Sequence, residues 1–168
     1  MSDAADLPGS PRLRFERLGV ARARRLAAGD LAGLDPAAGW PHADTLDAVR
    51  MAAEHATADD ETGFLVFLTA TGQAIGDAGW KGAPGADGTA EIGYGLAASV
   101  RGRGLGTELV GALAAWALRQ PGCGTVRAEV LPGNLPSRRA LERTGFTCQG
   151  EDGPYLVLTR TARVVTGE

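Results

Sequence analysis

A short stretch in the middle of the chain has the residue types of an anion-binding turn. Three glycines and two arginines stand within seven residues that precede a run with helical spacing, and the stretch reads Arg101-Gly102-Arg103-Gly104-Leu105-Gly106-Thr107. Glycine lets a backbone approach a ligand closely and adopt positive φ. The first turn of a helix adds unpaired N–H groups at the positive end of the helix dipole. The stretch therefore predicts an anion bound at the start of a helix.

Two nucleotide-binding loops fit this turn poorly. A Walker-type loop ends in Gly-Lys-Ser/Thr, which does not occur here. A dinucleotide-binding fingerprint needs G-x-G-x-x-G in an early β-α-β unit, whereas Gly102 to Gly106 reads G-x-G-x-G and follows a predicted meander of strands. A plain helix N-terminus with a flexible entry remains as a structural alternative.

The strand-like run before the turn offers a carboxylate and room for a ligand. Its residues alternate, so that Ile92, Tyr94 and Leu96 share one face, while Glu91 shares the other face with two glycines. Glycines on one face of a strand leave space for an extended ligand to lie against the backbone. Glu91 would place a carboxylate at the edge of such a site. The alternative is that Glu91 is an ordinary solvated strand residue.

Two other places carry polar residues with a structural and a functional interpretation. Asn134 and Ser137 have the spacing of a helix cap and a first-turn serine. Trp40 and His42 lie close together in a loop rich in glycine and proline, where they could contact a second substrate. The alternative for His42 is an exposed or capping loop histidine.

Hydrophobic periodicity and turn signals predict the elements that must position these residues. The expected order is β-α-α-β-β-β-α-β-α-β-β, a single mixed sheet of the α/β class with helices packed on it. Asp44 or Thr45 is expected to cap the second helix. Strands are expected over 13–18, 64–68, 74–81, 90–97, 125–131, 146–150 and 155–161, and helices over 20–28, 45–56, 107–120 and 134–145.

Length and composition limit the class of protein. The 168 residues predict residues 1–12 as a flexible leader and residues 13–168 as a single domain. A net charge of −3 argues against a nucleic-acid partner that needs a broad basic surface. Cys123 and Cys148 lack metal-ligand spacing, so no metal site is predicted. No apolar run reaches the roughly 18 residues needed to span a bilayer, and no signal-peptide core is present, which predicts a cytoplasmic protein without a membrane partner.

The combination of these motifs resembles the GNAT acetyltransferase superfamily, and within it the Rim-type group that includes ribosomal-protein N-acetyltransferases. The resemblance is most specific over residues 90–146. The Rim-type features are Ile75-Gly76-Asp77 to Trp80, Ala90-Glu91-Ile92-Gly93-Tyr94 and the Asn134/Ser137/Leu141/Gly145-Phe146 pattern. Many superfamily members carry a tyrosine as general acid where Leu141 stands. This difference leaves Ser137 or water for that role.

The resemblance implies a fold, a donor and roles for the residues above. Acetyl-CoA is the implied donor: the turn from Arg101 to Thr107 would hold its pyrophosphate, and the backbone near Leu96 would polarise the thioester. Asn134 and Ser137 would contact the cofactor, with Ser137 also a candidate acid. Glu91 would act as base, directly or through water.

The implied acceptor is a primary amine, either of a small molecule or of a protein N-terminus, and Trp40 and His42 are its expected contacts. Two other functions remain as alternatives: a non-catalytic acyl-CoA-binding or regulatory domain, and a general nucleotide-binding protein. A homodimer is left open by the sequence, as are the acyl-chain preference and the identity of the acceptor.

Overall fold

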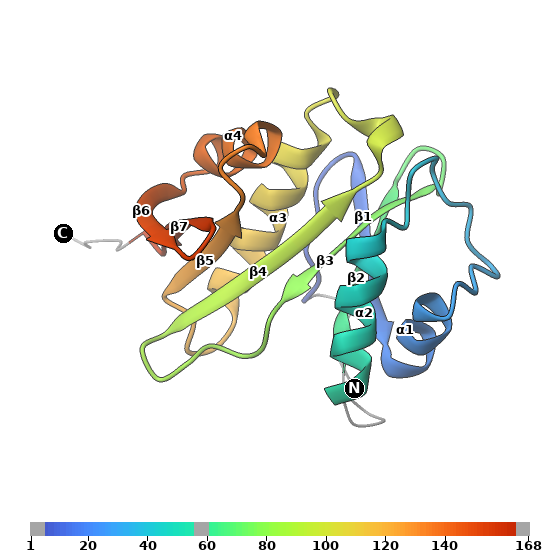
Figure 1. The fold of residues 1–168 in the computed structure, drawn as a ribbon, viewed down its shortest axis with the longest axis horizontal. Coiled ribbons are helices and arrows are strands. Elements are labelled where there is room, and N and C mark those ends of the chain that lie inside the picture. The colour runs from blue at the N-terminus through green and yellow to red at the C-terminus, as the bar shows by residue number, and fades with distance from the viewer. Residues whose placement is uncertain (1–5, 56–60, 164–168) are drawn as a thin grey trace.

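The computed structural model describes residues 6–55 and 61–163, which form one mixed α/β unit around a seven-stranded sheet (Figure 1). The sheet has the order β1-β2-β3-β4-β5-β7-β6, and only the pair β4–β5 is parallel among its hydrogen-bonded neighbours. The predicted fold class and element order are confirmed. The strands are β1 Leu13–Gly19, β2 Glu61–Leu68, β3 Ala74–Trp80, β4 Thr89–Leu96, β5 Thr125–Val130, β6 Thr147–Asp152 and β7 Tyr155–Thr161; the helices are α1 Val20–Ala27, α2 Ala43–His55, α3 Leu105–Arg119 and α4 Leu135–Arg143.

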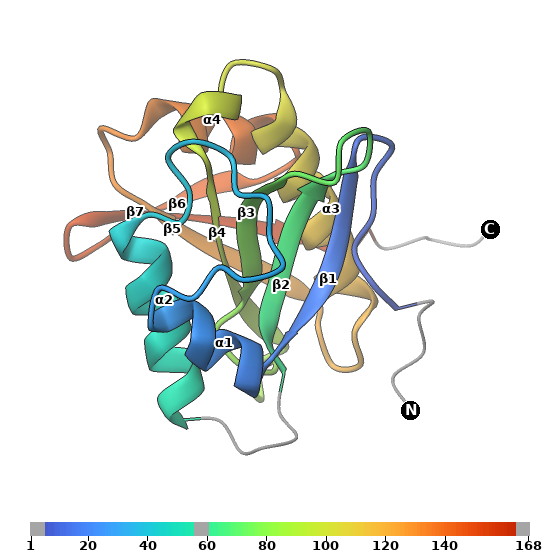
Figure 2. The same cartoon turned by 90° about the vertical axis from the view of Figure 1, so that its right-hand side faces the viewer.

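Helices cover both faces of the sheet, so the central strands are buried on both sides. Figure 2 shows α1 and α2 on one side of the sheet and α3 on the other. The β2 segment from Phe64 to Phe67 is apolar at every position and buried throughout, as expected of a strand with two covered faces. On α3, the apolar residues at helical spacing, Leu109, Val110 and Leu113, are fully buried.

Strands β4 and β5 pair only over their first halves. The register joins Thr89 to Thr125, Ala90 to Val126 and Glu91 to Arg127, and the ladder then ends. Beyond this point β4 stays paired with β3, while β5 stays paired with β7. The two strands therefore diverge in the middle of the sheet, which leaves backbone groups of β4 from Ile92 onward without a β5 partner.

The start of α2 differs from the expected position. The helix begins at Ala43, so Asp44 and Thr45 lie inside its first turn and the predicted cap at either residue is wrong. The carbonyl of His42 already accepts from the Leu46 backbone N–H at 3.1 Å, so helical hydrogen bonding begins before Asp44 and Thr45. The Thr45 hydroxyl instead donates a hydrogen bond to Asp77 of β3, 32 positions away in sequence.

The segment before β1 packs against α3 from residue 6 onward. The Trp116 indole N–H donates to the Asp6 carbonyl at 3.0 Å, and the Arg12 side chain bonds to Glu108 in the first turn of α3. The first five residues of the predicted leader, 1–5, lie outside the described residues. Residues 6–12 thus reach the helix that follows the glycine turn.

Candidate active site

The glycine turn forms the exposed entry to α3. Arg101, Gly102, Arg103 and Gly104 are all exposed, and Gly102 and Gly104 have φ values of 79° and 76°. Gly104 is the N-cap residue of α3, and no side chain caps this helix end. A left-handed N-cap without a side-chain cap leaves the first-turn N–H groups free to bind an anion. This is the arrangement that the sequence predicted for the turn.

Arg12 bonds to the glycine turn and to the first turn of α3, and it was not predicted as a site residue. Its Nε lies 2.7 Å from Glu108 Oε2, its backbone N–H donates to Glu108 Oε1 at 2.9 Å, and its Nη1 donates to the Arg103 carbonyl at 3.0 Å. A Cβ added at Gly104 would stand 3.6 Å from Arg12 Nη2. A third guanidinium is thus placed beside Gly104. No local signal marks Arg12, because its partners are more than 90 positions away.

Leu96 connects the divergent strand to the turn. A Cβ added at Gly106 would stand 3.7 Å from Leu96 Cδ1, so the end of β4 lies against the first turn of α3. The backbone of β4 from Ile92 to Leu96 has no β5 partner, which leaves N–H and C=O groups on that edge. An elongated ligand that hydrogen-bonds to this edge would reach the glycine turn at its far end.

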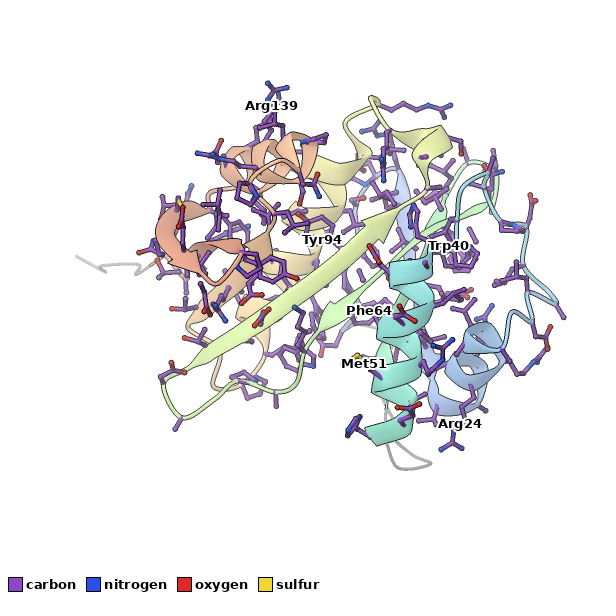
Figure 3. The ribbon with its side chains drawn as sticks, viewed as in Figure 1. Arg24, Trp40, Met51, Phe64, Tyr94 and Arg139 are labelled. Atoms are coloured by element: carbon purple, nitrogen blue, oxygen red, sulfur yellow. The ribbon has the colours of Figure 1, made fainter. Side chains whose placement is uncertain are left out.

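The start of α4 lies on the face of β4 that carries Tyr94. Asn134 Oδ1 accepts a hydrogen bond from the Ser137 backbone N–H at 3.4 Å, which confirms the predicted cap. The Ser137 hydroxyl shares a hydrogen bond of 2.6 Å with the Tyr94 hydroxyl, and Figure 3 shows Tyr94 between β4 and α4. Leu141, where a tyrosine would stand in many similar proteins, is completely buried. The phenol near Ser137 therefore comes from β4, and sequence analysis did not assign it a role.

Glu91 lies where β4 and β5 are still paired. Its Oε1 accepts from Lys81 Nζ at 2.7 Å and its Oε2 from Arg127 Nη1 at 3.2 Å, and its side chain is 21% exposed. Arg127 also bonds to Glu129 and Asp152, each at 2.9 Å. Glu91 is therefore part of a charged network in which each of its oxygens has a cationic partner. It shares a strand face with Gly93 and Gly95, as predicted.

A second polar cluster lies at the opposite end of β4. The Asp77 Oδ1 atom accepts hydrogen bonds from Trp40 Nε1 and from the Thr45 hydroxyl, each at 2.9 Å. His42 Nδ1 lies 3.5 Å from the Thr45 oxygen. Trp40 is 4% exposed, so it reaches the site through Asp77, and Figure 3 shows it beside the first turn of α2.

Burial raises the pKa of two of these groups. Desolvation raises the pKa of Asp77 above its usual value, and the hydrogen bonds from Trp40 and Thr45 only partly oppose this. Desolvation also raises the pKa of the Tyr94 phenol, against the opposing effect of its bond to Ser137. Asp77 is thus a buried carboxyl with an unfavourable ionised form, a condition found often at functional sites.

The predicted site residues fall into three groups around β4. The turn, Leu96, Asn134 and Ser137 lie on the α3 and α4 side, whereas His42 and Trp40 lie on the α2 side, and Glu91 is at the paired end of the strand. Asp77 and Thr45 were not predicted as site residues. The signal for Asp77 is a polar side chain in an otherwise apolar strand, which becomes informative once Trp40 and Thr45 are known to bond to it.

The described part of the chain holds neither a metal-binding cluster nor a membrane-spanning helix. Within residues 6–55 and 61–163, no group of three or more His, Cys, Asp or Glu side chains is placed to hold a metal ion. No helix of this part is both long and apolar enough to cross a membrane.

A family model described as an acetyltransferase (GNAT) domain matches residues 12–147. Among curated proteins, the kanamycin resistance protein of Rhizobium radiobacter is 41% identical over 71 residues, which is 39% of this chain and 66% of that protein. The aminoglycoside N(6')-acetyltransferase type 1 of Klebsiella pneumoniae is 41% identical over 71 residues, 39% of this chain and 35% of that protein. The chain thus spans less than two thirds of the length of these two relatives in the matched region.

Solved structures match over nearly the whole chain at low identity. Aminoglycoside acetyltransferase AAC(6')-Ib in complex with ribostamycin and coenzyme A has a TM-score of 0.63 at 23% identity, covering 89% of this chain and 93% of that one. The ribosomal-protein-S5-alanine acetyltransferase of Vibrio fischeri has a TM-score of 0.62 at 16% identity, covering 91% and 94%. The TM-scores establish a shared fold, and Rim-type enzymes are among the structural neighbours.

Proposed function

The chain belongs to the GNAT acetyltransferase family, and we propose that it transfers the acetyl group of acetyl-CoA to a primary amine. The observation that carries the proposal is the joining of two features: an uncapped, glycine-entered helix start and the unpaired edge of β4 that leads to it. Coenzyme A has an anionic end and a long arm with amide groups, so it fits a site that offers free N–H groups at one end and a strand edge along its length.

The donor would be held mainly by backbone groups. The N–H groups from Gly102 to Thr107 would bind the pyrophosphate, with Arg101 and Arg103 as flanking cations and Arg12 bracing the turn. The pantetheine arm would follow the unpaired edge of β4 towards Leu96, where a backbone N–H could stabilise negative charge on the thioester oxygen. Relatives solved with coenzyme A or acetyl-CoA support this donor.

The acceptor has to lose two protons. A lysine-type amine has a pKa near 10.4 and an α-amine about 7.7–8.0, so both are largely protonated at neutral pH. One proton must leave before the nitrogen can attack, and another leaves as the amide forms. We assign the first deprotonation to Glu91, acting through a chain of waters, because its carboxylate lies on the same face of β4 as Gly93 and Gly95.

Ser137 and Tyr94 would act at the departing thiolate. Their hydroxyls share a hydrogen bond between β4 and α4, so one of them can donate to sulfur while the other holds it in place. A thiolate is a good leaving group, with a conjugate pKa of about 8.5. Hydrogen bonding by this pair therefore suffices, and a phenol at position 141 is not required.

The proposed acceptor is a primary amine, either of a small molecule or of a protein N-terminus. The relatives include aminoglycoside acetyltransferases and a ribosomal-protein acetyltransferase, which points to both small-molecule amines and protein N-termini. The loop carrying Trp40 and His42 would face the acceptor, on the α2 side of β4. Because the chain matches only part of the length of the aminoglycoside-modifying relatives, these matches favour neither class of acceptor.

The decisive experiment measures thiol release from acetyl-CoA with a panel of amines. The panel contains short peptides with a free N-terminal amine, linear polyamines and kanamycin, each at saturating acetyl-CoA. Acetylation predicts amine-dependent thiol release, with an acetylated product 42 Da heavier by mass spectrometry, about the mass of an acetyl group less one proton. Tight binding of acetyl-CoA by calorimetry without turnover of any amine would instead indicate a non-catalytic acyl-CoA-binding domain.

A further inference from the structure

His42 carries a buried nitrogen that the fold leaves unused. Its Nε2 atom is buried and, in the part of the chain that the structure describes, has no hydrogen-bond partner. Buried polar atoms nearly always have a partner, because an unsatisfied one costs about 1–3 kcal/mol. An unpaired buried nitrogen beside a strand with an unpaired edge is therefore a candidate for use during the reaction.

The other ring nitrogen is connected to a buried carboxyl. The Thr45 hydroxyl donates to Asp77 Oδ1 at 2.9 Å, so its oxygen can accept a hydrogen bond only through its lone pairs. His42 Nδ1 lies 3.5 Å from that oxygen. This polarity favours the tautomer with the proton on Nδ1, and it leaves a lone pair on Nε2.

The connected groups surround one position on β4. A Cβ added at Gly95 would stand 3.5 Å from Asp77 Oδ1, 3.7 Å from the Thr45 oxygen and 3.9 Å from His42 Nδ1. Gly95 immediately precedes Leu96, at the end of the unpaired edge of β4. Glu91 is four residues away along the strand, or about 13 Å at the usual strand rise. The two ends of this face therefore carry different proton acceptors.

We propose that His42 accepts the second proton of the acceptor amine as the amide forms, and that Thr45 and Asp77 position its ring for this step. The inference rests on the proposed acetyl transfer and adds a catalytic residue to it. His42 is the catalytic group because it would contact the reacting nitrogen. Thr45 and Asp77 are positioning residues because they act through the ring.

The step balances without another reactant. The lone pair of the amine nitrogen forms the bond to the acetyl carbon, and the carbon–sulfur bond breaks with its electron pair on sulfur. The proton on nitrogen moves to His42 Nε2, which becomes an imidazolium. The nearby Asp77 carboxylate offsets this charge through Thr45. The imidazolium then returns its proton to the thiolate or to solvent.

The first test replaces His42 in the full-length protein. Acetyl-CoA and the best peptide amine of the panel serve as substrates, and His55→Ala is the matched control, because His55 is the other histidine and is exposed at the end of α2. A general base contributes about 100- to 10,000-fold to rate, so we expect His42→Ala to lower kcat at least about 100-fold with unchanged acetyl-CoA affinity. Added imidazole should restore part of the activity to His42→Ala and none to the control.

A comparison at high pH separates His42 from Glu91. At pH 9 the α-amine of a peptide is mostly neutral, since its pKa is about 7.7–8.0. The first deprotonation is then unnecessary, but the second proton still has to leave the nitrogen. The loss in Glu91→Gln should therefore shrink at pH 9, whereas the loss in His42→Ala should persist.

The positioning residues give a second measurement if His42→Ala fails to fold. Thr45→Val removes the hydroxyl at nearly constant shape, and Asp77→Asn keeps an oxygen that can accept from Trp40 and Thr45. Each should lower kcat about tenfold at unchanged acetyl-CoA affinity, and a purely structural role would leave kcat of the folded variants unaltered.

The outcomes distinguish this inference from the proposed function. If the unaltered protein releases no thiol with any amine, the proposed function is wrong and this inference fails with it. If the unaltered protein is active and His42→Ala keeps kcat within about threefold, or if a folded His42→Ala is not rescued by imidazole, only the role of His42 is overturned. Wild-type kcat in both Thr45→Val and Asp77→Asn would likewise overturn the relay.

Discussion

Gly104 is the residue on which the anion-binding turn depends most directly. It is the N-cap of α3 with φ 76°, a conformation that a β-branched residue adopts at a cost of about 1–2 kcal/mol. Gly104→Val should therefore move the first-turn N–H groups and weaken acetyl-CoA binding at least tenfold by calorimetry. Gly124→Ala is the control, because Gly124 has open space around it and no positive φ. Unchanged affinity in Gly104→Val would contradict the assignment of the turn to the pyrophosphate.

The same argument predicts a smaller effect at Gly106. Its φ is not positive, and an added Cβ would make only ordinary contact with Leu96 at 3.7 Å. Both glycines belong to the same turn motif, but the geometry gives them different roles. Gly104 is needed for its backbone conformation, whereas Gly106 is needed only where a ligand approaches closely.

Glu91 is the residue with which the first deprotonation can be tested. Glu91→Gln should lower kcat/KM at pH 7 by about 100-fold with a peptide amine, since a general base contributes on this order, and should leave acetyl-CoA affinity unchanged. Glu129→Gln is a matched control, because Glu129 also bonds to Arg127 but lies on β5. A pH–rate profile of Glu91→Gln parallel to that of the unaltered protein would mean that Glu91 only supports the local charge network.

At the scale of elements, α3 depends on the segment before β1. Arg12 joins this segment to the first turn of α3 through Glu108 and to the glycine turn through the Arg103 carbonyl. Its side chain is 51% exposed, so the ion pair should contribute at most about 1 kcal/mol to folding. Its larger effect should be on the position of the turn.

Arg12→Ala should therefore raise the KM for acetyl-CoA several-fold while changing the melting temperature little. For a protein of this size, 1 kcal/mol corresponds to about 2–4 °C. Arg14→Ala on β1 is the control: Arg14 is similarly exposed, lies over Phe67 and pairs with Glu16. A drop in melting temperature without a change in KM would assign Arg12 to stability alone.

The elements that the sequence predicted well are those with local causes. The strand, turn and helix around Gly104 were recognised because glycines, alternation and helical spacing occur within about twenty adjacent residues. The Asn134 cap was recognised for the same reason, since its partner is Ser137. The start of α2 was misplaced because the His42 carbonyl already accepts from the Leu46 N–H, and Thr45 inside the helix is instead the partner of Asp77 on β3.

At the scale of the whole molecule, the site could be predicted on one side of β4 only. The donor side follows from motifs that are continuous in sequence. The cluster on the α2 side joins Trp40 and Thr45 to Asp77 of β3, which is 37 and 32 positions away from them in sequence. No periodicity or spacing rule connects such residues. Only the packing of α2 against the sheet places a carboxyl, a hydroxyl and an imidazole around Gly95.

The buried carboxyl of that cluster should cost the whole molecule stability at neutral pH. Burial raises the pKa of Asp77, so the folded protein binds this proton more tightly than the unfolded chain does. The stabilising contribution of the protonated form is complete below the unfolded-state pKa, near 3.9. It is lost as the pH rises through the raised pKa of the folded state. Stability associated with Asp77 therefore falls from acid towards neutral pH.

Asp77→Asn should accordingly raise the free energy of unfolding at pH 7, because the amide oxygen still accepts from Trp40 and Thr45 without a buried charge. The gain should shrink as the pH is lowered through the raised pKa of Asp77, because Asp77 itself then becomes neutral. Urea unfolding at several pH values measures this, with Asp87→Asn as the control, since Asp87 is exposed and also accepts a hydrogen bond at Oδ1. A gain in stability together with the loss of kcat expected above would mean that the fold tolerates a destabilising carboxyl for its chemistry. Equal pH dependence in both variants would show that Asp77 carries no such cost.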